Sequence, residues 1–492
     1  MKKTFLFVIT GLLLTLGSSA QTGGTTGSLT WLLNEDKTVL TIGGTGEMPD
    51  YSTISSTGDA APPWWISGYT SVTHVVIEEG VSNIGHDAFS NFGKLISVII
   101  PESVSRIGDY AFLFCRNLTD IDIPNSVTSI GKFAFFNCSS LETIALSGNI
   151  ESVGEQAFAG CSKFTTVFIS KNASHLGNAI FAECSNLAAI HVDEDNPYYS
   201  SENGVFYNKD KTVLLQYPVQ KEDAGFDIPA TVTSIEKAAF AQNKHLASVT
   251  IPESVTTIGE SAFAGSALVS AIIPEKVTEI EPYTFAGCEN LVSVTVPNTV
   301  TAIGESAFAG CQKFASFRIP EEISRIERET FKNCAFVSVF IPSNVEFIGN
   351  YAFNMCVLLD SVTFSNGLKT IGVKAFAESG IKTVVIPETV TNIEYAAFAR
   401  CQNLTLVFLP EGLIQIDEDA FADCWNLVQI EVGWNTPPEV PEIFKNVEIN
   451  RASLYVPRGT KGLYDEAKVW KNFGAIIEKT SVDPTLAIAG TE

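Results

Sequence analysis

Ten cysteines are the residues of this chain whose side chains could most readily do chemistry, as nucleophiles, metal ligands or halves of disulfides. The segment IGESAFAGC at residues 303–311 returns almost unchanged as IGESAFAGS at 258–266 and as VGEQAFAGC at 153–161. A segment that recurs in this way is not one active site. The role of the sulfur therefore depends on the repeating element that positions it.

The repeating element is a unit of 23 residues, visible when the chain is aligned on the dipeptide Ile-Pro, as in residues 100–122 followed by 123–145. Fourteen units can be placed, and three of them are one residue shorter. We call the Pro position the origin of a unit, and the origins run from Glu78 to Pro410. A unit of this size cannot enclose its own apolar face, so the units are expected to stack on one another.

Every unit has a phenylalanine eleven residues after its origin. Stacked units would place these side chains one above the next, which predicts an aromatic spine, and burial of each ring should contribute roughly 1.5–3 kcal/mol. The spine consists of Phe89, Phe112, Phe135, Phe158, Phe181, Phe240, Phe263, Phe285, Phe308, Phe331, Phe353, Phe376, Phe398 and Phe421.

Three local patterns within a unit predict its backbone. Residues 118–124, LTDIDIP, alternate apolar and polar side chains, as expected of a strand with one buried face. Val127 and Ile130 continue the core in a second extended segment. The spacing of Phe135 and Cys138 is that of a short helical turn.

This repeat resembles that of the BspA-like group of bacterial leucine-rich-repeat proteins, which reads roughly LxxVxIPxSVxxIGxxAFxxC, and the similarity covers about residues 73–432. The resemblance implies a leucine-rich-repeat solenoid, right-handed, with parallel β-strands on the concave face. Short helical turns or irregular segments would form the convex side, and both ends would be capped. It also implies a bacterial cell-surface protein that adheres to host proteins such as fibronectin and fibrinogen.

All ten cysteines lie fourteen residues after an origin: Cys115, Cys138, Cys161, Cys184, Cys288, Cys311, Cys334, Cys356, Cys401 and Cys424. In the other units this position holds Phe92, Asn243, Ser266 and Ser379, the tolerance expected of a buried packing site with a weak donor. Export favours disulfides, and cysteines on adjacent stacked units, about 4.8 Å apart, would lie within disulfide range. Equivalent side chains on adjacent units point the same way, however, which does not suit a disulfide bridge. We therefore predict a reduced, buried cysteine ladder, with disulfides, a metal site or catalysis as alternatives.

The ends of the chain and one interruption lack the repeat. Lys2 and Lys3, an apolar run and the small residues Ser18 to Ala20 are typical of a secretory signal, which predicts export to the cell surface, the medium or the periplasm. The predicted organisation is a signal peptide at 1–20, an N-terminal cap with a β-hairpin at 21–72, repeats at 73–192, a hairpin-containing insert at 193–228, repeats at 229–432, a C-terminal cap at 433–480 and a tail at 481–492.

Two features outside the repeats permit more than one interpretation. Trp64 and Trp65 of the N-terminal segment are interpreted as apolar cover for the first unit, with sugar stacking as the alternative. The acidic run 193–195 is interpreted as a solvated loop, although its oxygens could hold Ca²⁺.

Composition and motifs exclude several functions. The chain has 31 Lys and Arg against 55 Asp and Glu, a net charge of −24, which argues against nucleic acid or anionic lipid as partner. No later apolar run approaches the roughly 20 residues of a membrane-spanning helix. Its five histidines have no zinc-site spacing, and it contains no P-loop, dinucleotide or HExxH motif. We expect neither enzyme activity, nor a cofactor, nor a metal.

The position two residues before each origin should face outward on the strands and is the least uniform. It supplies the candidate partner-binding residues Phe168, Ile272, Arg318, Phe340, Val385 and Phe408. Hydroxyl side chains dominate four residues before the origin, and such a face suits an extended partner, although these residues are also good strand formers. The leading hypothesis is an adhesin-like surface or secreted protein that binds a host or bacterial protein, such as an extracellular-matrix protein. Glycan binding and a passive spacer are the alternatives.

Overall fold

The computed structural model describes residues 22–52, 61–65, 68–144, 146 and 148–479. The predicted signal peptide at 1–20 and the tail at 481–492 lie outside these residues. The chain forms two compact units, one made of the described residues up to Asn186 together with Asp193–Pro197, the other of Leu187–Val192 and the residues from Tyr198 onward. We call them unit 1 and unit 2.

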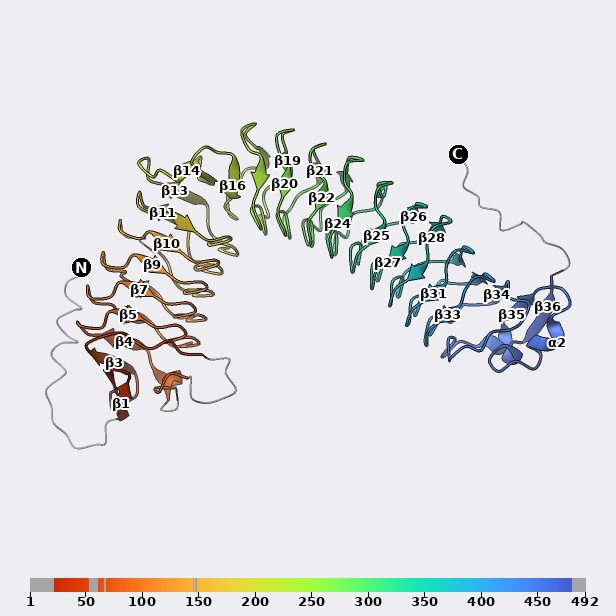
Figure 1. The fold of residues 1–492 in the computed structure, drawn as a ribbon, viewed down its shortest axis with the longest axis horizontal. Helices are drawn as coiled ribbons and strands as arrows, with labels where there is room; N and C mark the ends of the chain where they lie inside the picture. The colour runs from red at the N-terminus through yellow and green to blue at the C-terminus, as the bar shows by residue number, and fades with distance from the viewer. Residues whose placement is uncertain (1–21, 53–60, 66–67, 145, 147, 480–492) are drawn as a thin grey trace. The chain divides into compact units, whose positions relative to one another are not determined.

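Unit 1 is a stack of coils that carry two rows of parallel strands (Figure 1). It opens on an antiparallel sheet, and Asn34 closes the turn between the second and third strands by accepting hydrogen bonds from the backbone of Thr38 and Val39. One sheet has the order β1 (Thr22–Thr26), β2 (Leu29–Leu33), β3 (Val39–Gly44), β4 (His74–Ile77), β6 (Ser97–Ile99) and β8 (Asp120–Ile121), and the 3₁₀ turn η1 (Tyr69–Ser71) precedes β4. The other contains β5 (Asn83–Ile84), β7 (Arg106–Ile107), β9 (Ser129–Ile130), β10 (Ser152–Val153) and β12 (His175–Leu176), and β11 (Thr166–Ile169) follows β10 in the chain.

Unit 2 begins with a hairpin and continues as the same kind of stack. The hairpin consists of β15 (Val205–Asn208) and β16 (Val213–Gln216), flanked by β13 (Ala189–Val192) and β14 (Tyr199–Glu202), and β16 pairs in parallel with β18 (Ser234–Ile235), which pairs with β20 (Thr257–Ile258). The main strands of the next coils form a sheet of β17 (Gly225–Asp227), β19 (Ser248–Thr250), β21 (Ser270–Ile272) and β23 (Ser293–Thr295).

The C-terminal half of unit 2 carries a longer sheet. Its order is β26 (Ser338–Ile341), β28 (Ser361–Phe364), β30 (Thr383–Val385), β32 (Leu406–Leu409), β34 (Gln429–Val432), β35 (Ser453–Val456) and β36 (Ala475–Glu478). The short second strands are β22 (Glu279–Ile280), β24 (Ala302–Ile303), β25 (Arg325–Ile326), β27 (Phe347–Ile348), β29 (Thr370–Ile371), β31 (Asn392–Ile393) and β33 (Gln415–Ile416). The family resemblance led us to expect a solenoid of parallel strands with irregular connections, and the structure confirms this.

The Ile-Pro dipeptide explains where a main strand ends. Proline has no N–H to donate to the next strand, so the ladder stops there. The carbonyl of Pro101 then accepts a hydrogen bond from the backbone N–H of Val104 at 3.1 Å, which turns the chain into β7. The corresponding bond joins Pro297 to Val300 at 3.2 Å in unit 2.

The segment around each spine phenylalanine is not the short helical turn that the spacing predicted. The residues nine and thirteen positions after the origin have positive φ in all fourteen units, such as Tyr110 and Phe114 with φ 58° each. The N–H of Phe112 donates to Ala134 of the next coil at 2.7 Å, and that of Phe114 donates to Phe136 at 2.8 Å. Because these groups bond along the stack rather than within a helix, the left-handed residues are held in place by the neighbouring coil.

The spine phenylalanines form a continuous stack within each unit. Adjacent rings are 5.1 to 6.0 Å apart from Phe89 to Phe181 and 5.0 to 5.6 Å apart from Phe240 to Phe421, with planes within 20° of parallel. Trp64 covers the first ring of unit 1 at 5.8 Å. Its side chain is fully buried, so sugar stacking on Trp64 is excluded.

Tyr217 and Phe444 cover the two ends of the stack in unit 2, at 5.2 and 5.8 Å from their neighbouring rings. The 3₁₀ turn η2 (Ile449–Arg451), the helix α2 (Lys461–Tyr464) and the 3₁₀ turn η3 (Trp470–Asn472) follow β34 in the chain. Trp470 of η3 packs edge-on against Phe444. The helix α2 is four residues long. Within the part of the chain that the structure describes, no helix has the length and apolar character needed to span a bilayer.

Replacement of a central spine ring should strongly destabilise unit 2. Phe308 is fully buried, with Phe285 and Phe331 stacked on its two sides at 5.4 and 5.6 Å. We expect Phe308→Ala to lower the free energy of unfolding by about 3–5 kcal/mol, because the cavity has rings on both sides. Chemical denaturation followed by circular dichroism would measure this loss.

The control is Phe340→Ala, which removes the same side chain from an exposed strand position and should change stability by less than about 0.5 kcal/mol. Equal stability losses in the two variants would contradict the stacked core.

Candidate functional site

The ten cysteines all have the same environment in the structure. Every thiol is buried, and its Sγ donates to the backbone carbonyl of the spine phenylalanine in the preceding coil at 3.0 to 3.3 Å, as Cys311 does to Phe285. The equivalent Ser266 lies in the same row, with its Oγ 3.5 Å from Sγ of Cys288. The thiol therefore acts as a small donor between coils.

Burial makes these thiols poor nucleophiles. It raises the pKa of Cys184 and Cys356 to about 12 and that of Cys138 and Cys334 well above the ordinary range. The thiolate is the reactive form, and almost none of it is present at these four positions at neutral pH. Among the described residues, no group of three or more His, Cys, Asp and Glu side chains is placed to hold a metal ion.

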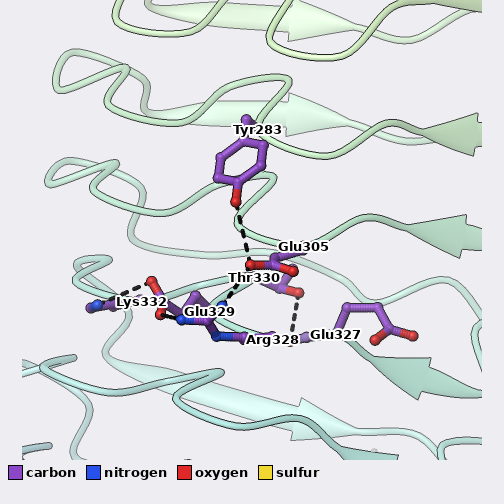
Figure 2. Close-up of polar contacts among 7 residues, drawn as sticks. All are labelled: Tyr283, Glu305, Glu327, Arg328, Glu329, Thr330 and Lys332. Atoms are coloured by element: carbon purple, nitrogen blue, oxygen red, sulfur yellow. Dashed lines mark hydrogen bonds and ion pairs between the residues drawn. The ribbon is translucent and has the colours of Figure 1, made fainter. Parts of the chain in front are cut away.

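A band of charged residues on the outer turns is another place where chemistry could occur (Figure 2). Arg328 donates to Glu305 at 3.1 Å and to Glu329 at 2.9 Å, and Lys332 donates to Glu329 at 3.0 Å. The hydroxyl of Tyr283 donates to Glu305 at 3.3 Å. Because both carboxylates are paired with cations, this band links successive coils and does not provide the two differently tuned carboxyl groups of an acid–base site.

The outward face of the main strands carries the predicted contact residues. Parallel register places residues two positions before the origin in one row, so that Ile272 lies beside Thr295. In the longer sheet the row runs from Phe340 through Thr363 and continues from Val385 to Phe408. The residues directly before and after each of these row residues in the chain point inward and are mostly buried.

Three of the predicted contact residues are well exposed. Phe168 on β11 belongs to unit 1 and is 64% exposed. Ile272 on β21 and Phe340 on β26 belong to unit 2 and are 68% and 58% exposed. Phe340 lies three coils after Ile272, which corresponds to roughly 15 Å along the stack.

The other three predicted residues are less available for contact. Val385 and Phe408 are half-buried, and the ammonium group of Lys479 lies over the Phe408 ring, 5.1 Å from its centre. Arg318 is exposed but lies outside the strands and pairs with Glu321 at 3.2 Å. The row position that predicts Phe408 as a contact residue carries no information about the C-terminal segment that covers it.

Sequence reasoning did not find a second exposed row at the start of the same strands. Val269, Val292 and Val337 occur five residues before their origins and are all exposed. The signal was present in the sequence, because other units place charged residues such as Asp360 and Lys382 at this position.

These rows form a surface with almost no charge. Five consecutive coils each contribute the four residues that lie five to two positions before the origin. Among these residues Arg318 is the single charged side chain, although the whole chain carries a net charge of −24. We call this the uncharged strand surface, and it consists of residues 247–250, 269–272, 292–295, 315–318 and 337–340.

The parallel strands, the left-handed turns and the buried ladder together define a leucine-rich-repeat solenoid. The model of the BspA type leucine rich repeat region matches residues 67–188, 224–337 and 324–449, in six copies. The chain belongs to this family.

Several solved structures are similar to the chain, whereas no curated protein matches it in sequence. A leucine-rich-repeat protein from Eubacterium ventriosum is 22% identical, with 96% of this chain and 99% of that chain covered and a TM-score of 0.46. A leucine rich cell surface protein from Faecalibacterium prausnitzii is 27% identical, with 85% and 96% covered and a TM-score of 0.40. A pneumococcal vaccine antigen is 18% identical, with 94% and 100% covered and a TM-score of 0.41.

The buried thiols should be inert in the folded protein. We expect Ellman's reagent to label the native chain slowly and all ten cysteines rapidly after denaturation, because only unfolding exposes the sulfur and allows it to ionise. Intact-mass measurement before reduction should give the mass of the fully reduced chain, without the loss of hydrogen atoms that disulfide formation causes. Fast labelling of the native chain, or a mass that indicates several bridges, would contradict the reduced ladder.

Proposed function

We propose that this chain is an exported, non-enzymatic binding protein of the bacterial surface or the secreted fraction. It engages a host or bacterial protein in an adhesin-like manner through the uncharged strand surface of unit 2. The observation that carries the proposal is the cluster of exposed apolar side chains on three of the five coils of this surface, in an otherwise strongly acidic protein.

The chemistry of this surface favours a polypeptide partner. Val269, Ile272, Val292, Val337 and Phe340 are large apolar groups exposed to solvent, and clusters of such groups often mark partner sites. Serine hydroxyls between the two rows can donate to and accept from a backbone. Burial of this surface requires little desolvation of charge, because Arg318 is its single charged side chain.

The alternatives are less well supported at this surface. A passive spacer has no need for exposed isoleucine and phenylalanine side chains, which lower solubility. Glycan binding along these strands would require planar polar side chains beside an aromatic ring, whereas the surface offers mainly hydroxyls and aliphatic groups.

Export is the second part of the proposal and rests on the N-terminal sequence. Lys2, Lys3, the apolar run at 5–16 and the small residues before Gln21 have the order of a secretory signal. When the full gene is expressed in a bacterial host, we expect the protein outside the cytoplasm to begin at Gln21 by N-terminal sequencing. A mature protein that retains Met1 would contradict export by cleavage at this site.

A double substitution tests the strand surface. Ile272→Ser with Phe340→Ser removes the two most exposed large apolar side chains of unit 2 in the row two residues before the origin. The double substitution should leave the melting temperature nearly unchanged. We expect it to weaken binding to fibronectin or fibrinogen, the host proteins implied by the family resemblance, at least tenfold, or about 1.4 kcal/mol. Surface plasmon resonance with the purified host proteins would measure the change.

Phe168→Ser is the matched control, because it removes an equally exposed ring from a main strand of unit 1. The affinity should also vary little between about 0.05 M and about 0.5 M salt, since the surface is nearly uncharged. Full binding by the double variant, or an equal loss in the control, would show that the partner does not dock on the uncharged strand surface.

A further inference from the structure

A groove lies at the edge of unit 2 where four successive coils turn after their cysteine positions. It has a volume of about 570 Å³ and is lined by residues including Val357, Gly380, Arg400, Asn403 and Trp425. This volume lies within the roughly 300–1,000 Å³ that is typical of small-molecule sites. The groove occupies a different part of the repeat from the uncharged strand surface.

A missing residue creates the floor of the groove. The segment from Phe376 to Pro387 has one residue fewer than the corresponding segment from Phe398 to Pro410. The turn after Phe376 is therefore the shorter one. The N–H of Gly380 donates to Cys356 at 3.2 Å, and a Cβ on this glycine would lie 2.4 Å from the carbonyl oxygen of Val357. Glycine therefore avoids a clash with the preceding coil at this position.

Two exposed apolar residues form the ends of the groove. Val357 and Trp425 both lie fifteen residues after their origins and are 62% and 60% exposed. Most other units have polar residues at this position, among them Ser139, Glu289 and Gln312, and the rest have glycine or alanine. The other five tryptophans of the chain are buried or half-buried, so Trp425 is the exposed indole of this protein.

Charged and amide side chains line the groove between these two ends. The Arg400 guanidinium lies 3.6 Å from Glu378 and 3.6 Å from Asp423, which come from the coils on either side. Asp423 also accepts from the amide of Asn446 at 2.9 Å, and the amide of Asn403 donates to the Gly380 carbonyl at 3.4 Å.

The backbone under these polar groups is held by the inter-coil ladder. The N–H of Arg400 donates to Ala422 at 2.7 Å, and that of Asp423 donates to Lys445 at 2.9 Å. Both residues have positive φ, so their side chains leave the coil in directions that the neighbouring coils set. A rigid base of this kind keeps the polar groups in position before a ligand arrives.

We propose that this groove binds a short, neutral saccharide. A pyranose has an apolar C–H face and a rim of hydroxyls that both donate and accept hydrogen bonds. The exposed indole of Trp425 suits the apolar face, the carboxylates of Glu378 and Asp423 accept from hydroxyls, and Arg400 and Asn403 donate to them.

The charges of the groove favour a neutral sugar over an anionic one. Two carboxylates surround one guanidinium, which leaves a local charge of about −1 in a chain of net charge −24. A sialylated or sulfated ligand would be repelled. A peptide would lack a deep apolar pocket for an anchor side chain, since the groove is an open surface hollow with charged walls.

The test uses the purified full chain on an array of neutral oligosaccharides built from glucose, mannose, galactose or N-acetylglucosamine, beside sialylated and sulfated glycans. We expect selective binding of neutral members, followed by isothermal titration with the best of them. Trp425→Ala should weaken that binding at least tenfold and leave the melting temperature unchanged. Trp425→Phe, which keeps an aromatic face, should retain affinity within about threefold.

Ile272→Ser with Phe340→Ser is the control for the strand surface and should bind the saccharide normally, so the groove and the proposed protein-binding function can fail separately. Absence of binding to every neutral glycan would overturn the proposal, as would a preference for anionic glycans or an unchanged affinity in Trp425→Ala. Competition of a peptide for the groove, without glycan binding, would assign it to a different class of ligand and would also overturn the proposal.

Discussion

The structure depends on one distance, the rise of about 5 Å from each coil to the next. Parallel strands hydrogen-bond at about 4.8 Å, and the rings of the phenylalanine spine lie 5.0 to 6.0 Å apart. Because these spacings nearly coincide, one rise satisfies the backbone ladder and the ring stack together. Each side chain then meets its equivalent in the adjacent coil. The sequence has to repeat every 22 or 23 residues for this reason, and inward positions accept few residue types.

The same rise explains why residues that are reactive in other proteins have a structural role here. A thiol fourteen residues after the origin reaches the carbonyl of the spine phenylalanine one coil away, and ten coils use it in this way. Asn243 occupies the position in another coil and donates through its amide to Pro218. In every coil but the first, where Phe92 occupies it, the position holds a small buried donor. Chemistry with outside molecules therefore has to take place at outward positions.

Two outward regions differ from the rest of the surface, and they occupy different parts of the repeat. The uncharged strand surface comprises residues five to two positions before the origin, whereas the groove uses side chains thirteen to sixteen positions after it. A substitution such as Phe340→Ser therefore leaves the groove intact, and Trp425→Ala leaves the strand surface intact. A solenoid of this kind can carry separate proposed sites for a protein and a saccharide, because the two regions lie at different positions of the repeat and share no side chains.

The sequence by itself determined the period, the spine and the inward position of the cysteines, because each depends on a residue type that recurs at a constant spacing. Residues 118–124 could likewise be predicted to contain a strand from their alternation, and the structure has β8 there. Only the tertiary structure decided the left-handed turns at Tyr110 and Phe114, since hydrogen bonds from the next coil hold them and no glycine marks them. It also decided that Lys479 covers Phe408 and that Val357, Arg400 and Trp425 line one groove. Residues far apart in the chain meet there through the register of stacked coils, and no single unit contains that information.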